Sequence, residues 1–150
     1  MLTARGPVVL DGGMSNALED RGHDLSDSLW SARLLRDAPE EVAAVHRAYF
    51  RSGAAVATTA SYQASVAGFA RAGATTEEAE RLVRSSVTLA RDVRDELTGD
   101  GRGRFVAASV GPYGAVLADG SEYRGRYDLG RAALGRAALR EFHLPRLELL

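Results

Sequence analysis

Short apolar runs alternate with longer amphipathic segments along this chain. Three of these runs are rich in small and β-branched residues and almost free of charge; they span residues 7–11, 56–59 and 105–110. Glycine, proline or polar residues follow each run, which is typical of a buried strand that ends in a loop. The pattern therefore predicts three strands covered on both faces.

Between these runs, apolar positions recur every three or four residues, as on one face of a helix. The clearest predicted helix begins after Thr75, which stands in capping-box spacing before Glu78. Another begins near Pro39, with acidic residues in its first turn. Polar residues 118–128 predict a loop. Helical sequence then continues to residue 150, with Pro145 either kinking that helix or starting a new one.

This order of elements predicts an α/β fold with a parallel sheet and right-handed crossover helices. Unusual loop segments follow the three predicted strands at residues 12–13, 61–63 and 111–113. Because the carboxyl ends of parallel strands meet at one edge of a sheet, we expect a ligand site there. The pattern fits an open doubly wound sheet and part of a (β/α)₈ barrel equally well.

Composition narrows the classes of function. The 150 residues are 45% hydrophobic and 26% charged, with a net charge of −1. This balance indicates a packed domain without the basic surface that nucleic-acid binding needs. No apolar run approaches the ~20 residues that span a bilayer, and no secretory pattern opens the chain. We therefore expect a cytoplasmic protein with neither nucleic-acid nor membrane partners.

Candidate chemistry lies in the predicted loops. Asp11 precedes two glycines, so its carboxylate can bind a substrate ammonium while the backbone approaches the ligand, or can simply form a turn. Tyr62 offers an aromatic face to a cationic ligand, or packs as a buried side chain. Trp30 is more typical of packing, and His46 fits a structural position on its helix. The three histidines have no metal-ligand spacing.

Six motifs occur in a fixed order along the chain. They are LDGGM at 10–14; LWSA at 29–32 with PE at 39–40 and His46; TTASYQAS at 58–65; SVGPYGA at 109–115; DGSEY at 119–123; and FH at 142–143 with PRL at 145–147. Together they resemble the homocysteine S-methyltransferase family, and within it the bacterial and plant branch that uses S-methylmethionine. The resemblance covers essentially all 150 residues.

The resemblance implies a (β/α)₈ barrel about twice as long as this chain, with L-homocysteine bound at its top. In the family a zinc ion holds the homocysteine sulfur as a thiolate, which attacks the methyl group of a sulfonium donor to give methionine. The matching positions are Asp11 for the substrate amino group, Gly12, Gly13 and Met14 around it, and Tyr62 and Trp30 on the donor side.

Three departures from the family pattern change these expectations. The zinc ligands of the family are three cysteines and this chain has none, so we expect zinc in the complete family enzyme and none on this chain. The match also stops before a fourth strand. We therefore expect residues 1–150 to form a partial barrel domain of about three βα units. Residues 130–134 repeat as 135–139, which indicates a tandem duplication.

The expected function is methyl transfer from S-methylmethionine or S-adenosylmethionine to L-homocysteine, with Asp11 as the catalytic-site carboxylate. The alternative is a non-catalytic half-barrel fragment. Unpaired edges of the first and third strands would then favour self-association of the isolated chain, without measurable methyl transfer. An unrelated open α/β binding protein would require all six motifs to coincide by chance.

Overall fold

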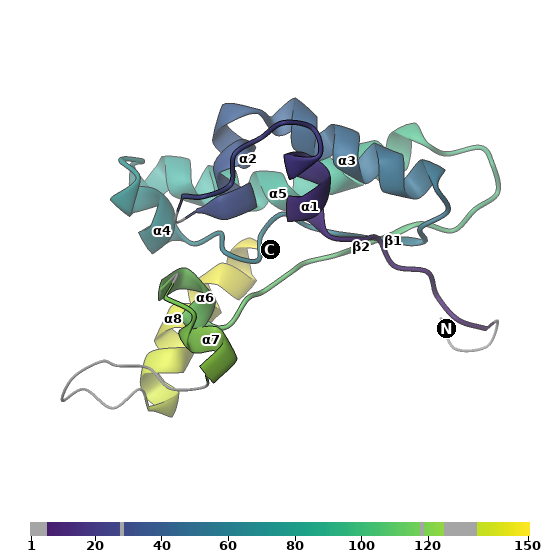
Figure 1. Ribbon diagram of the computed structural model, residues 1–150. Coiled ribbons are helices and arrows are strands. Elements are labelled where there is room, and N and C mark those ends of the chain that lie inside the picture. Colours follow the sequence, from purple (N-terminus) through teal and green to yellow (C-terminus); the bar gives the residue numbers. More distant parts are fainter. Residues whose placement is uncertain (1–5, 28, 118, 125–134) are drawn as a thin grey trace.

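A small parallel sheet lies beneath two long helices (Figure 1). The computed structural model describes residues 6–27, 29–117, 119–124 and 135–150. The sheet consists of β1 (Val56–Thr58) and β2 (Phe105–Ala107), which pair in parallel with Val56 opposite Phe105. The described part of the chain is therefore an α/β arrangement with two parallel strands in an open sheet.

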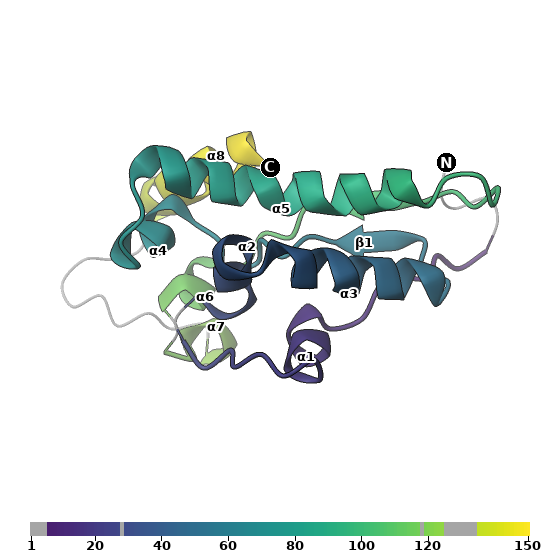
Figure 2. The same cartoon turned by 90° about the horizontal axis from the view of Figure 1, so that it is seen from above.

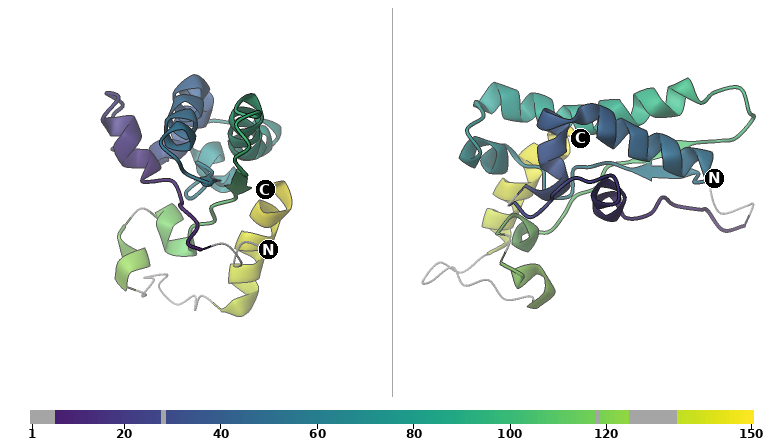
Figure 3. Two further views of the ribbon diagram at one scale, coloured as in Figure 1. Left: turned by 90° about the vertical axis from the view of Figure 1, so that its right-hand side faces the viewer. Right: turned by 45° about the horizontal axis from the view of Figure 1, so that its top comes forward.

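The two long helices, α3 (Pro39–Arg51) and α5 (Thr76–Glu96), lie side by side over one face of this sheet (Figure 2). The helix α8 (Arg136–Leu149) lies with two short helices, α6 and α7, beyond the end of β2 rather than over the sheet, and it contacts α5 and α6 (Figure 3). The short helices are α1 (Met14–Glu19), η1 (Trp30–Arg33), α2 (Leu34–Asp37), α4 (Val66–Arg71), α6 (Tyr113–Leu117) and α7 (Ser121–Arg124).

The long helices begin where the sequence predicts. The Thr75 hydroxyl caps α5 by accepting a hydrogen bond from Glu78 N at 3.2 Å. Pro39 occupies the first turn of α3, and two glutamates in that turn face the positive end of the helix dipole. Both predicted helices are confirmed, because caps and first-turn charges are signals contained in a few adjacent residues.

Most of the apolar core lies between the helices rather than over the sheet. Val42 and Val45 of α3 and Val83 of α5 are buried in one cluster with residues of α1, α2 and α4. A second cluster, of Phe50, Ala57 and Val93, joins both long helices to β1. Burying each large apolar side chain of this kind contributes roughly 1.5–3 kcal/mol, so these contacts fix α3 and α5 on the sheet.

The prediction of a buried strand at residues 7–11 is wrong. Only Leu10 forms a bridge, to Val56 of β1, flanked by hydrogen bonds from Ala55 N to Val9 O at 2.8 Å and from Asp11 N to Val56 O at 3.0 Å. The side chains of Val9 and Leu10 are 59% and 61% exposed. The segment pairs along one side only, and the described helices leave these apolar side chains uncovered.

The third predicted strand is shorter and more exposed than expected. β2 ends at Ala107 rather than at residue 110, and Phe105 is 47% exposed. Val106 is half-buried, whereas its neighbours on either side are exposed. The helices cover only the face that carries Val106, so the expectation of burial on both faces fails here. β1, by contrast, lies within one residue of its predicted bounds.

The C-terminal part differs from expectation in two further places. The predicted loop at 118–128 contains α7, and α8 continues through Pro145, so this proline starts no new helix. Residues 118 and 125–128 of that loop lie outside the described residues, as does the first copy of the repeat at 130–134. None of the helices in the described ranges is both long and apolar enough to cross a membrane.

Candidate functional site

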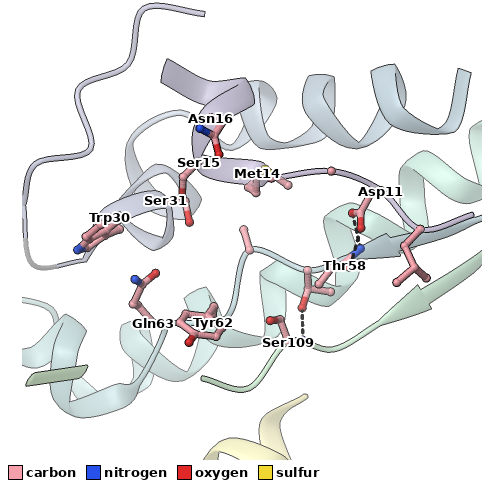
Figure 4. Close-up of a pocket in the computed structure, with 15 residues that line it drawn as sticks. Asp11, Met14, Ser15, Asn16, Trp30, Ser31, Thr58, Tyr62, Gln63 and Ser109 are labelled. Carbon is pink, nitrogen blue, oxygen red and sulfur yellow. Dashed lines mark hydrogen bonds between the residues drawn. The ribbon is translucent and has the colours of Figure 1, made fainter. Parts of the chain in front are cut away.

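A pocket of about 360 Å³ opens where β1 and the segment before α1 end (Figure 4). Its volume lies within the range of small-molecule sites. The lining comes from the segment leading into α1, from the start of η1, from the loop after β1 and from Ser109 after β2. All six residues singled out in the sequence line it: Asp11, Gly12, Gly13, Met14, Trp30 and Tyr62.

Asp11 is held at one end of the pocket by the last residue of β1. One carboxylate oxygen accepts a hydrogen bond from Thr58 N and the other accepts one from the Thr58 hydroxyl, each at 2.6 Å. A carboxylate has about four acceptor sites on its two oxygens, so acceptor capacity remains on Asp11. The half-buried carboxylate is thus fixed in direction and still able to bind a donor from the pocket.

The glycine backbone beside Asp11 lies against Tyr49 of α3. The Tyr49 hydroxyl donates a hydrogen bond to Gly13 O at 3.1 Å. A Cβ atom built on Gly12 would lie 2.7 Å from that hydroxyl, closer than real contacts allow. A side chain at this position would therefore have to displace the tyrosine ring, independently of any ligand.

Aromatic side chains form the other end of the pocket. Figure 4 shows Trp30, Tyr62 and Gln63 together, away from Asp11. Trp30 is 42% exposed and Tyr62 is 39% exposed. Neither side chain is therefore buried, as the alternative of a packing role would require. Trp30 has a φ of +49°. Such a backbone costs about 1–3 kcal/mol for a non-glycine residue and is often found at binding sites.

The loop that carries Tyr62 is joined to the end of β2 by hydrogen bonds. The Ser61 hydroxyl donates to Ser109 O at 2.8 Å, and Gly111 N donates to Tyr62 O at 3.0 Å. The Thr59 hydroxyl accepts a further bond from Ser109 N at 3.0 Å. The two loops at the carboxyl ends of the strands therefore form one connected structure below the pocket.

Burial favours the neutral forms of two titratable side chains near the pocket, Tyr62 and His46. Burial, assisted by the negative charge of Glu122, raises the pKa of the Tyr62 phenol above its ordinary value of 10. His46 of α3 is fully buried, and its burial lowers the pKa to about 4 although the Asp11 charge opposes this. Near neutral pH the carboxylate of Asp11 thus lies near a neutral imidazole, as expected for a structural histidine.

Sequence reasoning missed several residues of this site. It did not identify Thr58 as the partner of Asp11, nor Tyr49 as the side chain that lies against Gly12. It also left Ser15, Asn16 and Ser31 unassigned, although all three line the pocket. Their type and spacing are ordinary, and no local signal distinguishes them. Within the described residues, no group of three or more histidine, aspartate or glutamate side chains could hold a metal ion.

The chain is similar in sequence to proteins of one known family. The sequence model of the homocysteine S-methyltransferase family matches residues 8–150. Homocysteine S-methyltransferase YbgG of Bacillus subtilis is 48% identical over 149 aligned residues, which cover 95% of this chain and 46% of that protein. The homocysteine S-methyltransferase of Escherichia coli is 47% identical over 146 residues, covering 95% of this chain and 46% of the relative.

A solved structure agrees with the sequence match. The crystal structure of the homocysteine methyltransferase MmuM from Escherichia coli, in its metallated form, aligns with a TM-score of 0.87 at 47% identity. The alignment covers 99% of this chain and 51% of that one, so the chain spans about half the length of the relatives it matches. With a family match over nearly its whole length, the chain belongs to the homocysteine S-methyltransferase family.

Proposed function

We propose that this chain supplies the substrate-binding half of an enzyme that transfers a methyl group from a sulfonium donor to L-homocysteine. The observation that carries the proposal is the division of one pocket into an anionic end at Asp11 and an aromatic end at Trp30 and Tyr62. The amino-acid substrate needs an anionic group to bind its ammonium, and the cationic methyl donor needs an aromatic surface.

In this proposal Asp11 binds the ammonium group of homocysteine. The bonds from Thr58 orient the carboxylate before the substrate arrives, so little reorganisation is needed on binding. Gly12, Gly13 and Met14 line the adjoining wall, and the missing side chains of the two glycines let the substrate approach the backbone. The sulfur end of homocysteine then extends toward the aromatic end.

Trp30 and Tyr62 would receive the sulfonium group of S-methylmethionine or S-adenosylmethionine. A cation is attracted to the face of an aromatic ring because of the ring quadrupole, by about 2 kcal/mol when it is desolvated. A neutral phenol suits this role, and the raised pKa of Tyr62 keeps it neutral over the working pH range. Gln63 adds an amide at the same end.

We further propose that residues 1–150 form a partial (β/α)₈ barrel domain. The parallel bridge from Leu10 to Val56 and the pairing of β1 with β2 give three adjacent parallel segments, and this order supports the proposal. The two long helices lie on one face of the sheet (Figure 2). The other face would be the barrel interior, and the match to about half of the E. coli structure supports this arrangement.

The zinc ion of the complete family enzyme does not fit the donor set of this chain. Its expected ligands are thiolates, and the sequence contains no cysteine. When bound in a complete enzyme, zinc would lower the pKa of the homocysteine thiol and so supply the thiolate nucleophile. The residues described here would bind and orient the two substrates.

Substitution of Asp11 tests the proposal. In a complete relative that carries aspartate at the position of Asp11, changing it to asparagine should raise the homocysteine KM and lower kcat/KM by roughly 10- to 150-fold, the effect of losing a charged hydrogen bond. The matched control changes the residue aligned with Asp92, which is exposed on α5. Unchanged kcat/KM in a folded Asp11→Asn variant would reduce this residue to a structural turn.

A second candidate is a fragment without catalytic activity. The absence of cysteine, which leaves the expected zinc ligands missing, favours it for the isolated chain. The two candidates separate in a calorimetric titration of the purified 150-residue chain with L-homocysteine. Binding that Asp11→Asn weakens would support the substrate-binding half, and absence of binding would support the inactive fragment.

A further inference from the structure

A buried arginine lies below the aromatic end of the pocket. Arg146 of α8 is 2% exposed. Its Nε donates to Ala64 O at 3.0 Å and its Nη1 to Gly111 O at 3.1 Å. Its Nη2 donates to both Tyr62 O at 2.9 Å and Ser61 O at 3.3 Å. One guanidinium group thus bonds four backbone carbonyls from the two loops that follow β1 and β2.

This arginine has no carboxylate partner among the ion pairs of the described residues. Burial disfavours its charge and lowers its pKa from the ordinary value. The carbonyl dipoles and the ring of Phe142, whose centroid lies 5.1 Å from the guanidinium carbon, offset part of that cost. An apolar side chain would pack α8 without a desolvation penalty, so packing alone does not account for a charged group here.

Hydrogen bonds from Arg146 and Gly111 fix the position of the Tyr62 backbone. Tyr62 O accepts one hydrogen bond from Arg146 and another from Gly111 N. A Cβ atom on Gly111 would lie 2.4 Å from Tyr62 O, so the two backbones approach too closely for any other residue. With its backbone held from both sides, Tyr62 directs its ring into the pocket (Figure 4).

We propose that Arg146 is a positioning residue for the methyl donor. It is not among the described residues that line the pocket, so it acts through the backbone of Tyr62, whose ring forms the donor end. This inference rests on the proposed function, which places the sulfonium group against Tyr62. Asp11 is held separately, by Thr58, so the homocysteine end should not depend on Arg146.

Lysine cannot reproduce this arrangement. The guanidinium presents five N–H donors in a rigid planar fork, and four hydrogen bonds here leave from three different nitrogens. An ammonium group has three donors on one nitrogen. Arg146→Lys therefore keeps the charge but loses some of the hydrogen bonds to the carbonyls, so it tests the hydrogen bonds separately from the charge.

The experiment measures steady-state kinetics in a complete relative that carries the counterparts of Arg146 and Tyr62, with the arginine changed to lysine. We expect the KM for the sulfonium donor to rise about tenfold, while the homocysteine KM changes by less than about twofold. The matched control changes to lysine an exposed arginine of the same helix in that relative, the counterpart of the exposed Arg140 of this chain, and should alter neither KM. A purely structural role would lower the active fraction, reducing kcat without separating the two KM values.

A double-mutant cycle with Tyr62→Leu identifies the route of the effect. If Arg146 acts through Tyr62, the lysine substitution should add little to the donor KM of the leucine variant. Independent, additive effects would overturn the inference and leave the proposed function intact. The inference also fails, with the proposed function intact, if Tyr62→Leu raises the donor KM and the lysine variant does not. An unchanged donor KM in Tyr62→Leu would instead overturn the donor site of the proposed function, and the inference with it.

If the lysine variant of the relative folds poorly, amide hydrogen exchange on the present chain provides a second test. In Arg146→Lys the amide of Gly111, which donates to Tyr62 O, should exchange faster while the amides of α3 and α5 keep their protection. Loss of protection throughout the chain would show that Arg146 supports the whole fold rather than this loop, and would overturn the inference.

Discussion

Replacing His46 by leucine should remove part of the pH dependence of the chain's stability. The ring is fully buried, and neither of its nitrogens has a hydrogen-bond partner among the described residues. Burial lowers the pKa of His46 from 6.5 to about 4, and the charge of Asp11 opposes this only in part. Below pH 6.5 the unfolded chain therefore binds a proton that the folded chain excludes, so stability falls as the pH decreases toward 4.

The magnitude follows from these two pKa values. Between about pH 7.5 and about pH 5, the free energy of unfolding should fall by about 2 kcal/mol through this histidine alone. Urea unfolding followed by circular dichroism, at one fixed protein concentration, measures the change. His143, whose pKa is also lowered, contributes in the same direction, so the decisive quantity is the difference between the wild type and His46→Leu.

A core variant on the same helix separates titration from loss of packing. Val45 is 2% exposed, and Val45→Ala should destabilise the chain by the same amount at both pH values because valine does not titrate. His46→Leu should instead lose about 2 kcal/mol of pH dependence. Identical pH profiles for the wild type and His46→Leu would refute the conclusion that His46 is buried in its neutral form.

Three further outcomes are expected. Gly111→Ala should cost about 1–3 kcal/mol of stability, because its Cβ would meet Tyr62 O at 2.4 Å, whereas Gly103→Ala, with 3.9 Å to its nearest neighbour, should lower the melting temperature far less. Metal analysis after dialysis should find no stoichiometric zinc on this cysteine-free chain; about one equivalent that survives a mild chelator would contradict this. The exposed Leu10 and Phe105 side chains should make the isolated chain associate; sedimentation showing a monodisperse monomer with cooperative unfolding would count against it.

Helices could be predicted from the sequence more reliably than strands. The start of α5 is encoded by Thr75 and Glu78, three residues apart, and the start of α3 by Pro39 and the glutamates beside it. Burial of a strand depends instead on which elements cover it. The apolar runs at residues 7–11 and 105–110 therefore suggested buried strands, although the described helices cover only one face of the sheet.

Some residues of the site could likewise be predicted from the sequence, and others could not. Asp11 and Tyr62 could be selected because they follow predicted strands and match family motifs. Their supporting partners could not: Thr58 is 47 residues from Asp11, Tyr49 is 36 from the glycine it contacts, and Arg146 is 82 to 85 from its partners in the loop after β1. A contact between such distant residues depends on the packing of whole elements, which a single sequence does not display.

The distance in sequence between Arg146 and its partners also orders events during folding. Its four acceptors lie between 35 and 85 residues earlier in the chain. Closing such long loops costs entropy before any contact offsets it, so these bonds form after the local helices. During synthesis, the described residues that line the pocket, up to Ser109, are made before α8 exists. A nascent chain therefore carries these residues early, but the pocket acquires its final shape only after residue 146 has left the ribosome.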